Sequence, residues 1–456
     1  METFFIYTDL QNILLSMESD EDINVCKNYI EKHGLLKNLK RFESTMKLFA
    51  SVILAKPKVF NNILKLISFL EDSISDKMRY IDQESYYKGN EILFFFHLLI
   101  SNWKERFYFL CFHVPEEKQR TSVINTNNQY VNAIFDDNVE LLQHMISQNN
   151  YDIITKISCY DYIFRDLIEY TDIIGSSALF GSIKCFKYLM MISDDIDYES
   201  LLKNSICGGN YEIIHIVENH IKDLNNKSNQ NLLYLAIQFM NNDLIEYIID
   251  NYDVKIDTNC YNECIKSSNY EAMLILLELD EEKEENLNRY TQKEYIITPI
   301  NYSAQRSHFY FMKFLLSIDV VNPFKLDSHL FSLLQYATME GRHYIVEYII
   351  KNDLGDPNFA YSERRTPFEI CLENCDHYLF DLFSEKFECM KDEFCNCEII
   401  DDDDEKLEDH INQSEYVQKL VKDRNISKIN NMKSKIERSK KKKKYRRNRM
   451  KNKKFI

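Results

Sequence analysis

The segment SLLQYATMEGRHYIVEYII, residues 332–350, contains a small residue, Ala337, four positions before a glycine, followed by paired apolar residues. The segments NSICGGNYEIIHIVE (204–218) and LAIQFMNNDLIEYII (235–249) have the same arrangement of small and apolar residues. When the chain is aligned to itself on this arrangement, eight equivalent turn positions appear, at Asp137, Gly181, Gly209, Met240, Ser268, Ser307, Gly341 and Cys375. Their mean spacing is 34 residues, which is typical of a repeat protein.

Further columns of this alignment also repeat. The residue four positions before the turn is small in every copy: Ala133, Ser177, Ser205, Ala236, Cys264, Ser303, Ala337 and Cys371. The residue nine positions before the turn can cap a helix N-terminus in every copy: Asn128, Asp172, Ser200, Asn231, Asn259, Thr298, Ser332 and Thr366. After the turn, positions 4, 5, 8 and 9 are apolar at 30 of 32 places, the exceptions being Glu218 and Ser384.

The order of these columns predicts two short helices in each copy. The first helix begins after the capping residue and presents its small residue where a neighbouring helix approaches. It ends at the turn position, where a left-handed backbone suits glycine because glycine carries no Cβ. A second helix follows, with its apolar pairs on one face. Because two such helices cannot bury their apolar faces alone, we expect the copies to stack into an all-α array.

The repeated segments resemble the ankyrin repeat, whose signature is T-P-L-H-x-A followed by a glycine and I-V-x-x-L-L. The segment TPINYSAQRSHFYFMKFLL (298–316) and residues 332–350 carry the resemblance, and Thr366-Pro367 repeats the T-P opening. Asn301 and Glu369 replace the signature histidine. GGNYEIIHIVE is similar to the divergent ankyrin units of large families expanded in protozoan parasites. The resemblance covers about residues 125–390 and implies an ankyrin-type α-solenoid of about eight helix pairs.

The rest of the chain predicts three further regions. Residues 1–125 contain amphipathic helical patterns, and we expect a helical region that caps the first repeat. After the array (126–390), residues 391–432 form a linker that carries the acidic run Asp401 to Glu405. Residues 433–456 form a tail with 14 Lys and Arg and one acid, a charge of +13, whereas the net charge of the whole chain is −16. The protein is therefore expected to have an acidic body and a basic low-complexity tail.

Composition and motifs exclude several classes of protein. With 8 Gly and 6 Pro in 456 residues, and no G-x-G-x-x-G or Walker-type run, a nucleotide-binding fold that depends on glycine-rich loops is not expected. No catalytic motif occurs, so we expect no enzyme and no cofactor. The group Cys389, Cys395 and Cys397 matches no paired zinc knuckle, and we expect no metal site.

The start of the chain lacks a secretory pattern, and the longest apolar run, 92–100, is far shorter than the ~20 residues that span a bilayer. The 12 cysteines are therefore expected to stay reduced in an intracellular protein, cytoplasmic or nuclear.

The ankyrin resemblance implies a non-enzymatic scaffold that binds proteins on its concave face. In that family, the two residues just before the glycine position often face the partner. In the three best-matching repeats they are Gln305, Arg306, Met339, Glu340, Glu373 and Asn374. The alternative interpretation for each residue is an ordinary solvated position.

The basic tail is the sharpest local signal. Its densest part contains Lys440, Lys441, Lys442, Lys443, Lys444, Arg446 and Arg447. Such a run suits binding to an import receptor, contact with nucleic-acid phosphates, contact with an anionic membrane, or a purely solubilising role. The alternative function is therefore a nuclear adaptor whose tail contacts RNA or DNA. A third possibility is an enzyme regulator, or an enzyme with its site in residues 1–125.

Overall fold

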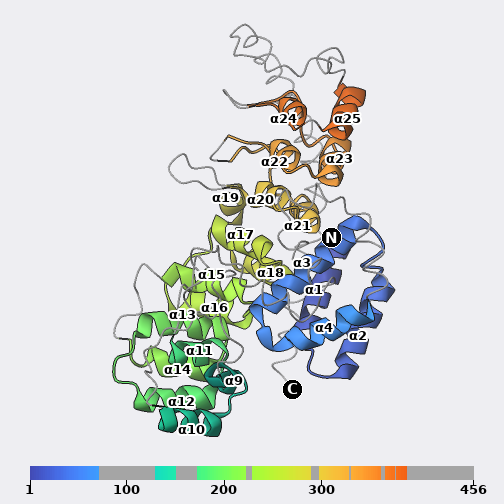
Figure 1. The fold of residues 1–456 in the computed structure, drawn as a ribbon. Helices are drawn as coiled ribbons and strands as arrows, with labels where there is room; N and C mark the ends of the chain where they lie inside the picture. Colours follow the sequence, from blue (N-terminus) through green and yellow to red (C-terminus); the bar gives the residue numbers. More distant parts are fainter. Residues whose placement is uncertain are drawn as a thin grey trace, which may run out of the picture. The chain divides into compact units, whose positions relative to one another are not determined.

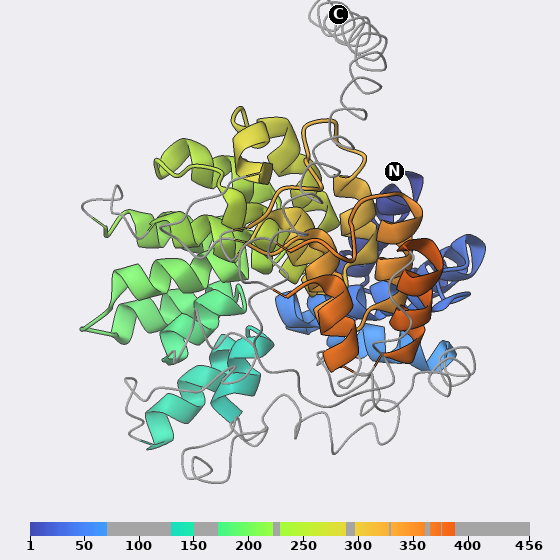
Figure 2. The same ribbon diagram turned by 90° about the horizontal axis from the view of Figure 1, so that it is seen from above.

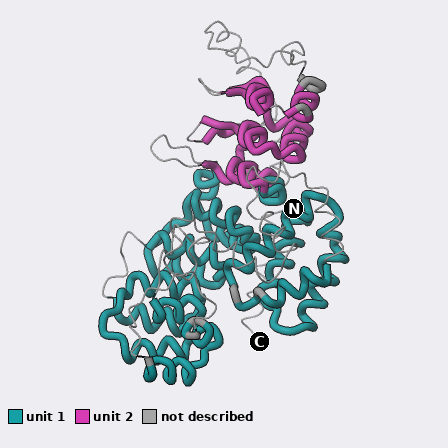
Figure 3. The backbone as a smooth tube through the Cα atoms, in the orientation of Figure 1, with its two compact units in different colours: residues 1–287, 308–314 teal, residues 288–307, 315–456 magenta. Residues whose placement is uncertain are grey.

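The structure is a computed structural model that describes residues 1–70, 129–149, 172–221, 229–288, 297–327, 330–360, 365–374 and 376–387. Every regular element within these ranges is a helix, as predicted (Figure 1). None of the described helices is long and apolar enough to cross a membrane. The chain divides into two compact units (Figure 3): unit 1 is Met1–Leu287 with His308–Phe314, and unit 2 is Asn288–Ser307 with the residues from Leu315 onward.

Helix pairs follow one another along the described chain. The first helices are α9 (Gln129–Phe135), α11 (Ile173–Leu179), α13 (Tyr198–Gly208), α15 (Gln230–Gln238), α17 (Thr258–Lys266), α20 (Pro299–Gln305), α22 (Leu333–Met339) and α24 (Pro367–Glu373). The second helices are α10 (Val139–Asn149), α12 (Ile183–Ile192), α14 (Tyr211–Glu218), α16 (Asp243–Asn251), α18 (Tyr270–Leu279), α21 (Phe309–Leu315), α23 (His343–Lys351) and α25 (His377–Phe387). A short helix, α19 (Lys283–Asn288), precedes α20.

First helices contact the first helices of neighbouring pairs. In unit 1, α9, α11, α13, α15 and α17 contact one another in that order, and α10, α12 and α14 do the same (Figures 1 and 2). In unit 2, α20 contacts α22 and α22 contacts α24. Within each unit, first helices from successive repeats, about 30 residues apart in the sequence, therefore pack side by side.

The small residues of the first helices are buried. All eight are 1% exposed or less: Ala133, Ser177, Ser205, Ala236, Cys264, Ser303, Ala337 and Cys371. Interiors pack at crystal-like density, so a larger or charged side chain at these positions would push adjacent helices apart. The predicted small-residue column is confirmed.

The turn positions have the predicted left-handed backbone. Seven of them have φ between 50° and 73°, although only three are glycines, and the eighth, Cys375, lies outside the described residues. At Gly341 the turn is closed by two hydrogen bonds, from Gly341 N to Thr338 O (3.0 Å) and from Arg342 N to Ala337 O (3.1 Å). This pair of bonds is the Schellman motif, which satisfies carbonyls at a helix C-terminus. The carbonyl of the small residue therefore fixes the entry to the second helix.

The predicted capping column is right in four repeats. There the predicted residues occupy the N-cap positions: Asp172, Thr298, Ser332 and Thr366. Asp172, Ser332 and Thr366 accept a hydrogen bond from an N–H group of the first turn, whereas the Thr298 side chain makes no capping bond. Three others lie inside their helices: Ser200, Asn231 and Asn259. Asn128 lies outside the described residues. The column is wrong in the three repeats because a capping residue occurs earlier, and Asp197 and Asp257 already accept bonds from first-turn N–H groups.

Side-chain amides connect successive repeats in unit 2. Asn301, at the signature-histidine position, donates from Nδ2 to the carbonyl of Phe331 (3.2 Å), the residue before the next N-cap. Gln335 occupies the equivalent position one repeat later and donates from Nε2 to Arg365 O (2.6 Å). These bonds satisfy a backbone carbonyl of the neighbouring repeat, so they fix the distance at which two repeats stack.

The N-terminal region has its own helices. They are α1 (Glu2–Leu15), α2 (Asp20–His33), α3 (Leu39–Ala55), a 3₁₀ turn (Pro57–Val59) and α4 (Phe60–Phe69). Helix α1 packs on α18 as well as on α2 and α3. We expected this region to cap the first repeat, and for α1 that expectation is wrong, because α1 lies against the fifth repeat.

Two kinds of contact hold α1 there. Phe4 and Tyr7 pack on the ring of Tyr270, with ring centroids 5.0 and 5.2 Å apart. The fully buried Gln11 donates from Nε2 to Asn269 Oδ1 (2.8 Å), and its Oε1 accepts from Tyr270 N (2.7 Å). Gln11 thus supplies, from 259 residues away in the sequence, an acceptor for a free N–H group at the N-terminus of α18.

We predict that Ala337→Asp destabilises the protein by about 3 kcal/mol or more, because it places an unpaired charge where two first helices meet. Met339→Asp is the matched control, because Met339 is 43% exposed on the same helix. Thermal melting followed by circular dichroism measures both variants. Equal melting temperatures for the Ala337 variant and the parent would contradict the alignment.

Gln11→Ala is expected to destabilise the protein by about 1–2 kcal/mol, because it leaves the buried N–H of Tyr270 without its acceptor and removes one donor to Asn269 Oδ1. Hydrogen exchange should report faster exchange at the start of α18. Asn12→Ala, at the adjacent exposed position, should leave both measurements unchanged. Unchanged protection of Tyr270 in the Gln11 variant would show that the region is held by apolar packing alone.

Candidate partner-binding surface

Three successive first helices of unit 2 place the predicted partner-binding residues in equivalent positions. Each helix, α20, α22 and α24, ends in one such pair, and these helices contact in order. Arg306, Met339, Glu373 and Asn374 are exposed, whereas Gln305 and Glu340 are partly buried. We call these six residues the turn row. The alignment therefore brings side chains about 34 residues apart in the sequence to the same turn of neighbouring helices.

The turn row carries charges of both signs. The guanidinium of Arg306 lies over the Tyr302 ring, 5.4 Å from its centroid. Burial raises the pKa of the Glu340 carboxyl, and the positive charges of Arg342 and Arg306 oppose that rise. Glu373 forms an exposed ion pair with Arg365. The row thus combines an exposed methionine with a cation and carboxylates, which suits recognition of a polar protein surface with an apolar contact.

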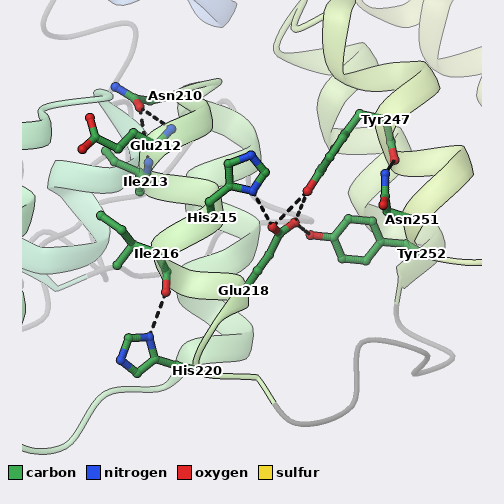
Figure 4. Close-up of polar contacts among 10 residues, drawn as sticks. All are labelled: Asn210, Glu212, Ile213, His215, Ile216, Glu218, His220, Tyr247, Asn251 and Tyr252. Atoms are coloured by element: carbon green, nitrogen blue, oxygen red, sulfur yellow. Dashed lines mark hydrogen bonds and ion pairs between the residues drawn. The ribbon is translucent and has the colours of Figure 1, made fainter.

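A second polar group lies in unit 1 and was missed from the sequence. Glu218, at the end of α14, was only an exception to the apolar column. Figure 4 shows its carboxylate between His215 of its own helix and two tyrosines of the next repeat. The Tyr247 hydroxyl donates to both carboxylate oxygens (2.7 and 2.9 Å), and the Tyr252 hydroxyl donates to Oε1. His215 Nδ1 lies 2.9 Å from Oε2.

The surroundings of Glu218 explain why a carboxylate is tolerated there. Its side chain is only 13% exposed, and it accepts hydrogen bonds from both phenols. Burial, together with bonding to this carboxylate, raises the pKa of Tyr247 and of Tyr252, so both phenols stay protonated well above neutral pH. The hydrogen bonds of Glu218 connect α14 to α16 and to Tyr252, the C-cap of α16. We therefore assign this group a structural role. The sequence did contain a signal for this group: Glu218 is an acid at a position that is apolar in most repeats, and the following repeat carries tyrosines.

Asn210 completes this region by capping α14. Its Oδ1 accepts from the N–H groups of Glu212 (3.0 Å) and Ile213 (3.3 Å), as Figure 4 also shows. The same side chain donates from Nδ2 to Gly181 O of the preceding repeat (3.3 Å). A residue that the alignment placed directly after the turn therefore caps its own second helix and binds the previous repeat.

Other predicted sites fall partly or wholly beyond the described residues. Lys440 to Lys444, Arg446 and Arg447 lie outside them, as do Cys389, Cys395 and Cys397 and the acidic linker. Within the described ranges, no group of three or more His, Cys, Asp or Glu side chains is arranged to hold a metal ion. Cys371 is buried in the small-residue column, and its thiol donates to the carbonyl oxygen of Asp376 (3.2 Å).

Comparison with known proteins adds one match. A family model described as a domain of unknown function (DUF3447) matches residues 193–276, which include α13 to most of α18 and the Glu218 group. No curated protein matches the chain. The matched segment ends just after the residues that Gln11 contacts, so the part similar to this family includes the docking position of α1.

Glu218→Ala is predicted to destabilise the protein by about 2 kcal/mol or more, because two tyrosine hydroxyls lose their acceptor. Glu218→Gln should cost less, since an amide oxygen can still accept. Glu212→Ala on the same helix is the control: Glu212 is exposed and forms an exposed ion pair with Lys187, so its loss should cost at most about 0.5 kcal/mol. Urea unfolding measures the three variants, and equal midpoints for Glu218→Ala and Glu212→Ala would contradict a structural role.

Proposed function

We propose that residues 126–390 form an ankyrin-type α-solenoid and that the protein is a non-enzymatic scaffold that binds other proteins. The repeated helix pairs, the left-handed turns and the contacts between successive first helices support the solenoid. The observation that carries the function is the turn row, in which equivalent positions of three neighbouring helices hold exposed and chemically different side chains. The core columns hold similar residues in every repeat. The residues that differ between repeats therefore lie mainly at exposed positions, where a partner protein can contact them.

The turn row can change without loss of the fold. The residues that hold the repeats together are the buried small residues, the turn bonds and the interrepeat amides, none of which belongs to the row. Stability in repeat arrays is the sum of contributions from each repeat and from each interface between neighbours, so exposed side chains contribute little to it. Binding and stability are therefore separable by mutation in this protein.

The test is a triple charge change in the row, Arg306→Glu, Met339→Glu and Glu373→Lys, in the full chain. We expect partners captured by the parent, and identified by mass spectrometry, to be lost while the melting temperature stays within a few degrees. The control carries Lys313→Glu and Lys351→Glu, two exposed changes on second helices. Retention of the same partners by the triple variant would reject the turn row as the binding surface.

The second candidate function, a nuclear adaptor that contacts nucleic acid, is favoured by the 14 basic residues of 433–456. Replacement of Lys440 to Lys444 with Ala should shift a fluorescent fusion toward the cytoplasm. RNA binding, if present, should fall steeply between about 50 and 200 mM salt, because several phosphate contacts release counterions. An unchanged distribution would leave the tail without a targeting role, and salt-independent binding would exclude phosphate contacts.

A further inference from the structure

A cavity of about 280 Å³ in unit 1 lies where the N-terminal region meets the second helices. Its walls include Leu15 of α1 and Lys56, the C-cap of α3. The repeats contribute the start of α16, with Asp243 and Leu244, and Glu271 near the start of α18. At about 30 Å³ for each water molecule, this volume has room for a ligand of several non-hydrogen atoms.

Lys56 is an unusual lysine within this cavity. Its Nζ donates to Asn241 Oδ1, and no carboxylate of the described residues lies within ion-pair distance of it. Asn241 is held in turn, because its Nδ2 donates to Ile206 O (2.7 Å) and Cys207 O (2.8 Å). The amine is therefore positioned by a fixed partner, and none of the carboxylates in the described part of the chain forms an ion pair with it.

Burial lowers the pKa of the Lys56 amine to about 8, and the nearby Cys207 opposes this change. An ordinary lysine, with a pKa of about 10.4, is almost entirely charged at neutral pH. At neutral pH a larger fraction of Lys56 than of an ordinary lysine is therefore a neutral amine, which has the lone pair that a nucleophile needs.

The other walls indicate which electrophile fits. Asp243 and Glu271 make the cavity unfavourable for an anionic ligand, which argues against phosphates, carboxylates and acyl donors with anionic groups. Leu15, Met240 and Leu244 offer apolar contacts to an alkyl group. A neutral, partly apolar carbonyl compound satisfies both conditions.

We propose that Lys56 is the nucleophile of a binding site for small neutral aldehydes and holds them as an imine. The neutral amine adds to the carbonyl carbon and forms a C–N bond, and one N–H proton passes through solvent water to the carbonyl oxygen, which gives a neutral carbinolamine. That hydroxyl takes a second proton from solvent and leaves as water while the nitrogen lone pair forms the C=N bond, and loss of the remaining N–H proton to solvent gives the imine. No oxidant or reductant is required.

The experiment treats the full chain with butanal and sodium cyanoborohydride, which reduces an imine to a stable alkylamine, and maps the adducts by mass spectrometry. At pH 7.5, Lys56 should be alkylated at least about 10-fold faster than the exposed Lys58, because burial lowers the pKa of the Lys56 amine. The rate at Lys56 should saturate with butanal concentration, whereas the rate at Lys58 should stay linear. Equal rates, or a linear dependence at Lys56, would overturn the proposal.

Two variants separate the cavity from simple amine reactivity. Lys56→Arg keeps a donor for Asn241 and should lose the adduct while its circular dichroism and the Lys58 rate remain unchanged. Leu15→Trp should fill the cavity and slow butanal at Lys56 by about 10-fold, with a smaller effect on formaldehyde and none on Lys58. If Leu15→Trp folds normally and leaves the butanal rate at Lys56 unchanged, the ligand does not occupy this cavity and the proposal fails.

Discussion

The close approach of successive first helices is the constraint on which the rest of this structure depends. It requires a residue without a large side chain at one position of every first helix, and all eight of these residues are buried. The carbonyl of the same residue accepts the bond that closes the following turn, as Ala337 does for Arg342. One position therefore sets both the spacing between repeats and the direction of the second helix. Its tolerance for Ala, Ser and Cys alone follows from this double role.

In several repeats the residue after the turn, which the sequence suggested as a helix cap, also binds the preceding repeat in the tertiary structure. Asn210, Asn241 and Asn269 each donate to a backbone carbonyl of the preceding repeat. An asparagine amide can donate and accept at once, so it can bond the previous repeat while its oxygen serves another group. In two of these residues that group comes from the N-terminal region: Gln11 binds Asn269, and Lys56 binds Asn241. The same polar positions thus hold the repeats together and receive α1 and α3.

Function follows from what these constraints leave free. The buried columns and the interrepeat bonds fix the helices, so exposed positions at the ends of first helices can vary without structural cost. In unit 2 this freedom gives the turn row its mixture of methionine, arginine and carboxylates. In unit 1 the junction with the N-terminal region leaves a cavity that Lys56 lines.

The sequence by itself determined the helix pairs, the buried small residues and the left-handed turns, because these depend on contacts within one repeat or between identical positions of adjacent repeats. The same local logic misplaced the caps at Ser200 and Asn259, where an aspartate two or three residues earlier competes for the same N–H groups. Only the tertiary structure decided where α1 docks and what Glu218 and Lys56 contact. Gln11 and Asn269 are 258 residues apart, and Lys56 and Asn241 are 185 apart. No periodicity relates such residues, and their pairing is decided by which surfaces fit once the repeats have stacked.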